Sequence, residues 1–202
     1  MKIKKALVLL FIPFFADMLV ACCDCEEPQL FKYTHTGLVL MHLDNHGQLP
    51  VITADDPVLK EAYGIRMLLK AEAVAFQQPS FSFFVSRSYA FSCRCEATIQ
   101  YLPKDSITGF RIITMNDFDP QHPAETDISD YFRLLSGYDY STITDFLHKE
   151  AEIFTYDNPK QIVLDAMLVH PPAQKGAYRF RVEIDLSDGR KFIKETSTIE
   201  LI

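Results

Sequence analysis

The chain has 202 residues, a formal net charge of −7 at pH 7 and no tryptophan. A chain of this length forms one domain or at most two small ones, and it can bury a core without help from a metal. The acidic balance argues against nucleic acid as a partner, because phosphate contacts need lysine and arginine.

The N-terminal residues have the composition of an export signal. Lys2, Lys4 and Lys5 form a basic head, and residues 6–15 are an apolar run. That run is too short to span a bilayer comfortably and matches the apolar region of a signal peptide. We therefore expect residues 1–21 to be a signal peptide that is removed on export.

The four residues Leu19-Val20-Ala21-Cys22 resemble the lipobox of bacterial lipoproteins. In that family the cysteine receives a diacylglyceryl group and becomes the new N-terminus. The resemblance implies lipidation of Cys22 and a membrane as partner, because two or three acyl chains anchor a protein stably. Asp17 departs from the family pattern, since a charge so close to the cleavage site is unusual. The alternative interpretation is a buried N-terminal helix of a cytosolic protein.

We expect residues 22–30 to form a lipidated acidic tether. The run Cys23-Asp24-Cys25-Glu26-Glu27 resembles the surface-export signal of lipoproteins from the Bacteroides group. This resemblance implies a lipid-anchored protein of the outer membrane that is exposed on the cell surface. Otherwise the acidic residues would only keep the tether solvated. The remaining residues, 31–202, are expected to form a single β-rich domain.

Residues 31–43 alternate between apolar and polar side chains and predict a strand. Val39 and Met41 are expected on its apolar face and His42 on the opposite, polar face. Gly37 interrupts the run and predicts a bulge.

Three short elements are expected next. Residues 44–47 form a turn, and residues 49–53 a short returning strand. Asp55-Asp56-Pro57 is a good start for a short helix over residues 58–63, because an aspartate caps it and a proline opens it.

Residues 65–76 fit two patterns. Their leucine, lysine, alanine and glutamate favour a helix by propensity. The strict alternation of apolar and charged residues favours a strand, and we prefer the strand because the alternation gathers the charges on one face. Residues 77–88 indicate a polar and aromatic loop or an irregular strand, and residues 89–101 lead into a further β run.

The second half of the chain continues the β pattern. Residues 107–115 predict a strand followed by a turn. Capping residues precede two expected short helices, at 128–135 and 143–151. Residues 161–169 are again apolar and favour a strand.

The C-terminal residues carry the clearest hairpin pattern in the chain. Residues 178–186 alternate, Ser187-Asp188-Gly189 forms a turn, and residues 191–202 return. Seven or eight short strands with turns between them predict a mainly β fold, an antiparallel β-sandwich that is immunoglobulin-like or related, with a few short helices.

The pattern as a whole resembles an uncharacterised family of β-rich surface lipoproteins of the Bacteroides group. The residues that carry this resemblance are Leu19 to Cys22, Tyr89 to Cys93, Asn116 to Ile128, and the hairpin around Asp188-Gly189. The resemblance spans nearly the whole mature chain. It implies no activity, because none is assigned to that family.

If Cys22 is lipidated, four cysteines remain: Cys23, Cys25, Cys93 and Cys95. An even count in an exported protein indicates disulfides. Joining a cysteine of the first pair to one of the second would close a loop of roughly 70 residues and contribute about 4 kcal/mol. The alternatives are free thiols or a four-thiolate metal site, although the usual zinc spacing is wider than Cys-x-Cys.

Residues 116–127 form the densest polar cluster. Asp117 and Asp119 are candidate calcium ligands, because oxygen donors at such spacing hold that ion. The helix–loop–helix calcium pattern fails, since it needs a glycine at the sixth position and Ile128 occupies the twelfth. The preferred interpretation is a solvated loop with a helix cap and no cofactor.

No local marker of a zinc protease, serine hydrolase or nucleotide-binding loop is found. We therefore predict a cell-envelope lipoprotein that acts as a non-enzymatic module, either structural or binding a glycan or an envelope protein. The alternative is a hydrolase of exported polymers such as glycans, with two carboxylates positioned by the fold. An enzyme would show converging ionisable groups with perturbed pKa values, and a binding module an exposed aromatic or apolar patch.

Overall fold

The computed structural model describes residues 29–54, 56–77, 99–136, 139–150 and 160–202. These residues form mainly β-strands, with one short α-helix and two single 3-10 turns among them. The strands are β1 (Gln29–Asp44), β2 (Val51–Thr53), β3 (Tyr63–Gln77), β4 (Ile99–Pro103), β5 (Ile107–Thr114), β6 (Phe132–Ser136), β7 (Asp139–Ser141), β8 (Gln161–Leu168), β9 (Gly176–Tyr178), β10 (Phe180–Leu186), β11 (Lys191–Glu195) and β12 (Ile199–Leu201). The helix is α2 (Ile143–Glu150), and the 3-10 turns are η1 (Lys60–Ala62) and η2 (Ser129–Tyr131).

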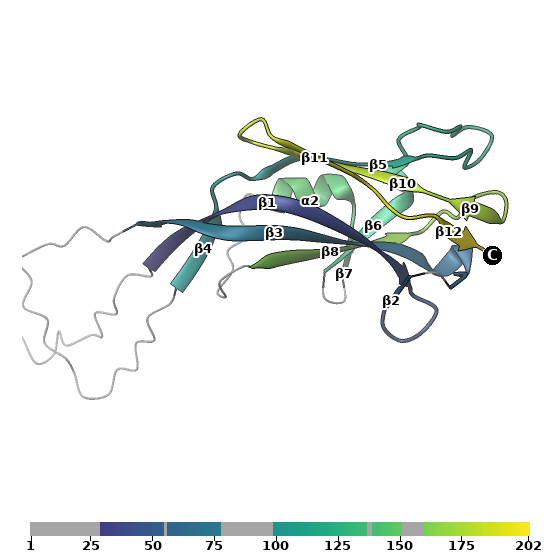
Figure 1. Cartoon of the computed structure of the whole chain (residues 1–202), viewed down its shortest axis with the longest axis horizontal. Coiled ribbons are helices and arrows are strands. Elements are labelled where there is room, and N and C mark those ends of the chain that lie inside the picture. Colours follow the sequence, from purple (N-terminus) through teal and green to yellow (C-terminus); the bar gives the residue numbers. More distant parts are fainter. Residues whose placement is uncertain (1–28, 55, 78–98, 137–138, 151–159) are drawn as a thin grey trace, which may run out of the picture.

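Two sheets pack face to face (Figure 1). The larger sheet has the order β2-β1-β3-β8-β6-β7, with β4 paired to β1, and the smaller sheet has the order β11-β10-β5. A two-stranded ribbon of β12 and β9 lies at the end that holds the C-terminus. All pairs are antiparallel except β1 with β4. The predicted mainly β, antiparallel sandwich is therefore confirmed.

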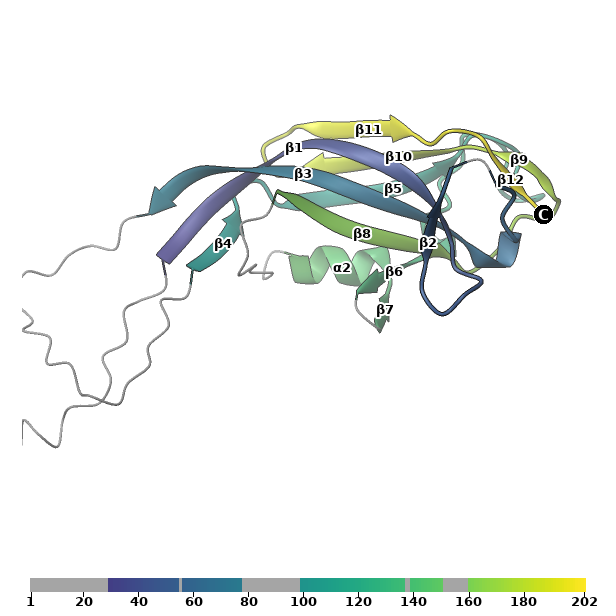
Figure 2. The same cartoon turned by 60° about the horizontal axis from the view of Figure 1, so that its bottom comes forward.

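The long hairpin of β1 and β3 runs along the whole larger sheet, and its open end extends with β4 beyond the smaller sheet (Figure 2). We call this end the arm: residues 29–34, 70–77 and 99–104. The C-terminus lies at the opposite end of the molecule.

The core lies between the two sheets. From the larger sheet, alternate residues Ile65, Met67 and Leu69 of β3 are fully buried. Phe180, Val182 and Ile184 of β10 meet them from the smaller sheet. Each such side chain contributes roughly 1.5–3 kcal/mol by leaving water, so this alternation is what holds the sheets together.

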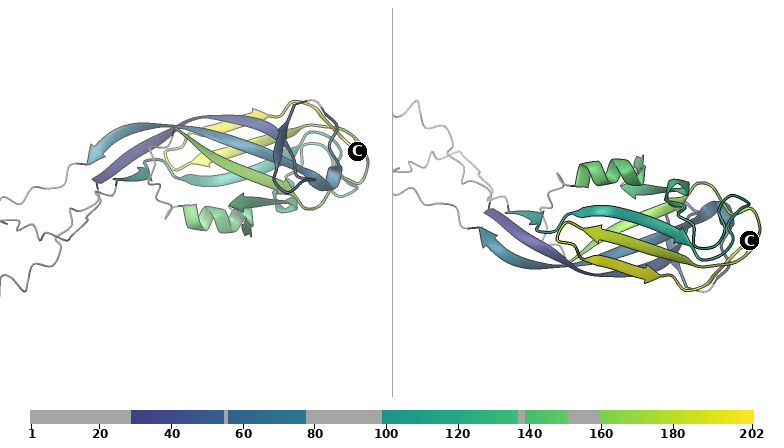
Figure 3. Two further views of the ribbon diagram at one scale, coloured as in Figure 1. Left: turned by 90° about the horizontal axis from the view of Figure 1, so that it is seen from below. Right: turned by 90° about the horizontal axis from the view of Figure 1, so that it is seen from above.

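Helix α2 lies along one side of the sandwich (Figure 3). Ile143 is buried in the core, and Phe146 and Leu147 pack against it. Thr142 caps the helix, because its hydroxyl oxygen accepts the backbone N–H of Asp145 at 3.0 Å. This helix matches the one expected over 143–151.

The alternation in β1 was predicted correctly, and Tyr33 is buried on the predicted face, but after Gly37 the opposite face packs against the core. Leu38 is buried and Leu40 packs against the core, whereas Val39 and Met41 are partly exposed. The register of β1 against β3 shifts between His35 and Gly37. This bulge, which the sequence predicts, moves every following side chain to the other face of the sheet.

Two predicted helices are corrected. Over 58–63 the structure shows only the turn η1 before β3 begins. Over 128–135 it shows the turn η2 followed by strand β6, which pairs with β8. Phe132 and Leu134 are buried in the core at alternate positions, so the packing of a strand prevails over the helix caps upstream.

Residues 1–28 and 78–98 lie outside the described residues. The predicted lipidation at Cys22 and the disulfide candidates Cys23, Cys25, Cys93 and Cys95 fall there. Among the described residues, every helix is too short or too polar to span a membrane.

Candidate functional site

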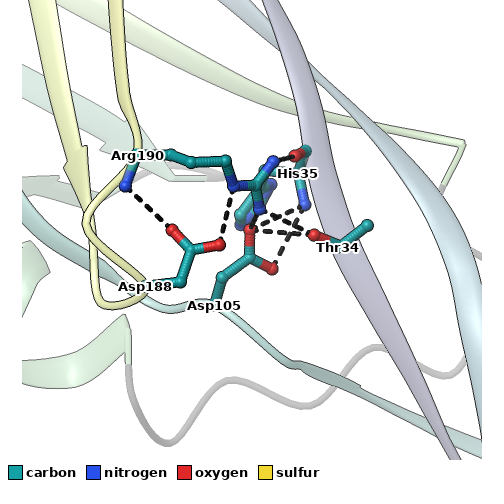
Figure 4. A network of polar contacts seen from close by, with 5 residues as sticks. All are labelled: Thr34, His35, Asp105, Asp188 and Arg190. Atoms are coloured by element: carbon teal, nitrogen blue, oxygen red, sulfur yellow. Dashed lines mark hydrogen bonds and ion pairs between the residues drawn. The ribbon is translucent and has the colours of Figure 1, made fainter.

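A buried carboxylate, Asp105, joins three parts of the chain where the arm meets the smaller sheet (Figure 4). It follows β4, and its oxygens accept hydrogen bonds from Thr34 Oγ1 at 3.0 Å and from the backbone N–H of His35 at 3.2 Å. The guanidinium of Arg190 donates to the same carboxylate. A buried charge persists only with such partners.

Arg190 comes from the turn between β10 and β11 and makes further bonds to β1. It donates to the carbonyl oxygen of His35 at 2.6 Å and to Thr34 Oγ1 at 2.8 Å. Asp188 in the same turn accepts the Arg190 side chain at 2.6 Å and its backbone N–H at 3.0 Å. These two bonds, the backbone one first, hold the pKa of Asp188 below its usual value. The network thus fastens the hairpin turn to β1.

His35 lies beside this network, and its ring is fully buried. Among the described residues, neither ring nitrogen has a hydrogen-bond partner. Burial lowers the pKa of His35, and the charge of Arg190 acts in the same direction, against Asp105. The imidazole is therefore neutral, and it makes an edge contact with Tyr33 at 5.5 Å between ring centroids.

His42, seven residues further along β1, has a partner on each ring nitrogen. Nδ1 lies 2.9 Å from the hydroxyl of Tyr63, and Nε2 lies 2.9 Å from Oγ of the exposed Ser197. A serine, a histidine and a third group in this order match the general layout of an activated nucleophile.

The direction of the hydrogen bonds argues against Ser197 as an activated nucleophile. Burial raises the pKa of Tyr63 well above its ordinary value, so the phenol keeps its proton. We assign His42 Nδ1, 2.9 Å from the phenol oxygen, as the acceptor of that proton, so Nε2 carries the ring hydrogen and donates to Ser197. His42 is thus no base for this serine, and it ties β1 to the segment before β12.

The third network lies in the loop after β5. His122 Nδ1 lies 2.9 Å from both carboxylate oxygens of Asp119 and 3.2 Å from the hydroxyl of Tyr131. Desolvation alone would raise the pKa of Asp119, but hydrogen bonds from the His122 ring and from the backbone of Gln121 and His122 lower it. Desolvation and the nearby Asp119 raise the pKa of Tyr131, whose ring also contacts that of His170.

Asp117 and Asp119, the candidate calcium ligands, accept hydrogen bonds from the backbone of this same loop. Asp117 accepts the backbone N–H of Ala124 at 2.9 Å, and Asp119 accepts that of Gln121 at 2.7 Å. Such bonds are typical of a turn that stabilises itself. The described residues contain no group of three or more histidines, cysteines or carboxylates placed to hold a metal ion.

The central part of the outer face of the larger sheet is aliphatic, and the rows on either side of it hold Lys70 with Gln161 and Met167 with Arg133. The residues of this central part alternate with those of the core, and the strand register aligns Val39, Leu68 and Val163 in one row across β1, β3 and β8. Val163 is 47% exposed. The next row holds Met41, Arg66, Asp165 and Leu135. We call these seven residues the aliphatic face.

The two charges of the aliphatic face neutralise each other. Arg66 donates to both carboxylate oxygens of Asp165, at 2.7 and 2.6 Å. This two-pronged geometry satisfies both side chains within the sheet. The face therefore presents apolar surface with no net charge.

The outer face of the smaller sheet, which comes forward in the right-hand view of Figure 3, is charged. It carries cross-strand ion pairs, of which Arg111–Glu183 at 2.5 Å and Lys191–Asp185 at 2.9 Å are examples. Paired charges of this type are well solvated. The contrast marks the aliphatic face as the candidate binding surface.

Sequence reasoning missed Asp105, Arg190 and His42 as partners in networks. The residues that meet in each network are far apart in the chain, by 85 positions for Asp105 and Arg190. The one available signal was Asp188-Gly189, which places Arg190 at a tight turn.

The comparisons with known proteins match the chain over most of its length. A protein-family profile described as "Domain of unknown function (DUF5034)" matches residues 35–198. No curated protein matches. Solved structures that match include C-terminal domains of two streptococcal proteins, and the chain spans about half the length of each. The Streptococcus pyogenes antigen I/II-family protein AspA is 13% identical over 82% of this chain and 46% of that one, with a TM-score of 0.25. The Streptococcus agalactiae AgI/II polypeptide BspA is 11% identical over 81% and 49%, with a TM-score of 0.25.

Proposed function

The chain belongs to the DUF5034 family of unknown function, and we propose its role from its own residues: a lipid-anchored cell-envelope protein whose sandwich is a non-enzymatic binding module. The observation that carries this proposal is the aliphatic face. It carries a row of apolar side chains, the partly exposed Val39 and Leu68 and the exposed Val163, across the paired strands β1, β3 and β8. Apolar surface of this kind is typical of an interaction site.

The chemistry of the face favours a protein over a glycan. Its seven residues are aliphatic or a neutralised ion pair. Beside Leu135 the second row continues into the exposed Tyr140 of β7, so the face itself is aliphatic and stacking with a sugar would rest on that neighbouring ring. Methionine and arginine, present here as Met41 and Arg66, are enriched in the centres of protein interfaces.

The polar networks support binding over the hydrolase alternative. The carboxylate of Asp105 is buried and occupied by Thr34, His35 and Arg190. His42 donates to Ser197 and so leaves that serine unactivated. Each network joins strands or loops of the sandwich.

The export signal and the sequence Leu19 to Cys22 support the envelope location and the anchor. Strand β1 begins at Gln29, so the domain follows Cys22 after a short tether. Mass spectrometry of the protein purified from its membrane fraction tests the anchor. We expect the mass of a chain that starts at Cys22 and carries acyl groups, and Cys22→Ser should release the protein. An unmodified N-terminus beginning at Met1 would refute the anchor.

A photo-reactive amino acid in place of Val163 tests the binding face in the producing cells. The matched control is Ile193 on the outer face of the smaller sheet, which is 51% exposed against 47% for Val163. We expect one discrete protein adduct at position 163, lost when Leu68→Lys is added, and none at position 193. Equal adducts at both positions, or an adduct indifferent to Leu68→Lys, would refute the proposed face.

A further inference from the structure

The arm collects basic side chains that have no acidic partner. Lys32, Lys70 and Lys104 lie on it, and Lys160 lies at its base, where its carbonyl oxygen accepts the backbone N–H of Ala71. All four lysines are exposed, and the described residues provide no ion pair for any of them. Most of the described arginines are paired, Arg66 and Arg111 among them, and Lys175 and Lys194 are exposed lysines elsewhere that also have no ion pair among the described residues.

The opposite end of the molecule is acidic. The loop after β5 holds Asp117, Asp119, Glu125 and Asp127, and it lies with the C-terminus at the far end from the arm (Figure 1). On the arm, the exposed carboxylate is that of Glu72. Among the described residues, lysines thus outnumber carboxylates at the arm, and carboxylates gather at the opposite end of the long axis.

The chain enters the domain at the positive end. β1 begins at Gln29, and residues 23–28 separate it from Cys22. The seven steps from Cys22 to Gln29 reach at most roughly 25 Å even when fully extended. A lipid on Cys22 would therefore hold the start of β1, and with it the arm, close to the membrane surface.

From this placement we propose that the arm binds anionic lipid headgroups and that the domain stands on the membrane with its acidic end outward. The proposal rests on the lipid anchor proposed above. Exposed lysines next to an anionic surface attract it, and the attraction decays within about 8–10 Å at physiological salt. A tether that reaches at most roughly 25 Å keeps the arm lysines near the surface and allows them to approach within this decay length.

The first test measures lipid binding without the anchor, using the chain after residue 21 with Cys22→Ser and cosedimentation with vesicles. Vesicles of phosphatidylcholine with phosphatidylglycerol are compared with pure phosphatidylcholine at low salt. We expect preference for the anionic vesicles that fades as salt rises. Each arm lysine contributes about fivefold, so Lys32→Gln with Lys70→Gln should lower partitioning about 25-fold.

The matched control is Lys175→Gln with Lys194→Gln, which makes the same charge change at exposed lysines away from the arm. We expect it to change partitioning less than twofold. An equal loss for both pairs, or no preference for anionic vesicles, would overturn the proposal. This result does not depend on whether Cys22 is lipidated. The mass of the protein purified from its membrane fraction tests the lipid anchor separately.

The second test uses the lipidated full protein in vesicles with a photo-reactive amino acid at Val74 or Val169. These valines are similarly exposed, 46% and 43%, and lie at the arm and at the far end of β8. We expect crosslinks to lipid from position 74 and none from position 169. Crosslinks from both positions in equal amounts would overturn the upright orientation.

Discussion

His35 and His42 are two buried histidines on one strand with opposite hydrogen bonding. The ring of His35 has no partner among the described residues, and that of His42 has two. His42→Phe should cost about 1–3 kcal/mol, because it leaves the buried hydroxyl of Tyr63 unpaired. His35→Phe should leave stability unchanged or raise it, because two unsatisfied polar atoms disappear. Denaturant unfolding at pH 7 measures the stability of both variants. Equal losses of stability would contradict the difference in hydrogen bonding between the two histidines.

His35 also makes the stability of the fold depend on pH. The pKa of His35 is lowered from 6.5 by burial, so the unfolded chain takes up a proton there before the folded chain does. Stability should therefore fall as pH drops from about 6.5 toward the lower folded-state pKa, and His35→Phe should remove this part. Loss of the carboxylate contributions of Asp119 and Asp188, whose pKa values are lowered, begins only below 3.8. Unfolding curves of both proteins from pH 7 to 4.5 isolate the histidine.

Arg190 and Arg179 contrast a buried with an exposed ion pair. Arg190→Met leaves the carboxylate of Asp105 buried without its cation, which costs about 3 kcal/mol, the low end for such pairs because Arg190 is partly exposed. Arg179→Met removes a 3.6 Å pair with Glu195 in solvent and should have no measurable effect. Thermal unfolding compares the stability of the two variants. An Arg190→Met variant that is as stable as the unchanged protein would contradict a stabilising ion pair between Arg190 and Asp105.

At the scale of elements, β3 depends on a glycine. A Cβ on Gly64 would lie 2.8 Å from Sδ of Met167 and 3.0 Å from the carbonyl oxygen of Ala166. Gly64→Ala should therefore cost about 1–3 kcal/mol, because the backbone of β8 cannot withdraw. Gly37→Ala is the control, since its Cβ would meet only Lys70 Cδ at 3.9 Å. Denaturant midpoints of the two variants should differ clearly, and equal midpoints would contradict the close approach.

The elements also show what the sequence can predict. Alternation identified β3 and β10 because one face of each is buried in the core. It misassigned the buried face of β1, since the bulge at Gly37 reverses the alternation midway. It missed β6, because helix caps are local and the pairing of β6 with β8 is not. The same limit hides the networks, whose members meet only through strand register.

On the scale of the whole molecule, the buried residues form two clusters. The large one joins both sheets, and a small one of Tyr33, Ala71 and Tyr101 lies in the arm. The arm should therefore open locally at lower free energy than the sandwich. Hydrogen exchange measures this: the amide of Ala71 should exchange faster than those of Ile65 and Val182. Equal protection along β3 would contradict it.

The long hairpin has a mechanical consequence. β1 begins at the end where the proposed lipid anchor would attach, and it stays paired with β3 from Leu30 to Asp44, almost the length of the domain. The hydrogen bonds of this ladder lie across the strands, so a pull along β1 loads them in shear, and they share the force. A peeling force would break them one at a time. A pulling force between the tether and a partner bound to the sheet would thus load the domain in shear, the direction in which it resists unfolding most.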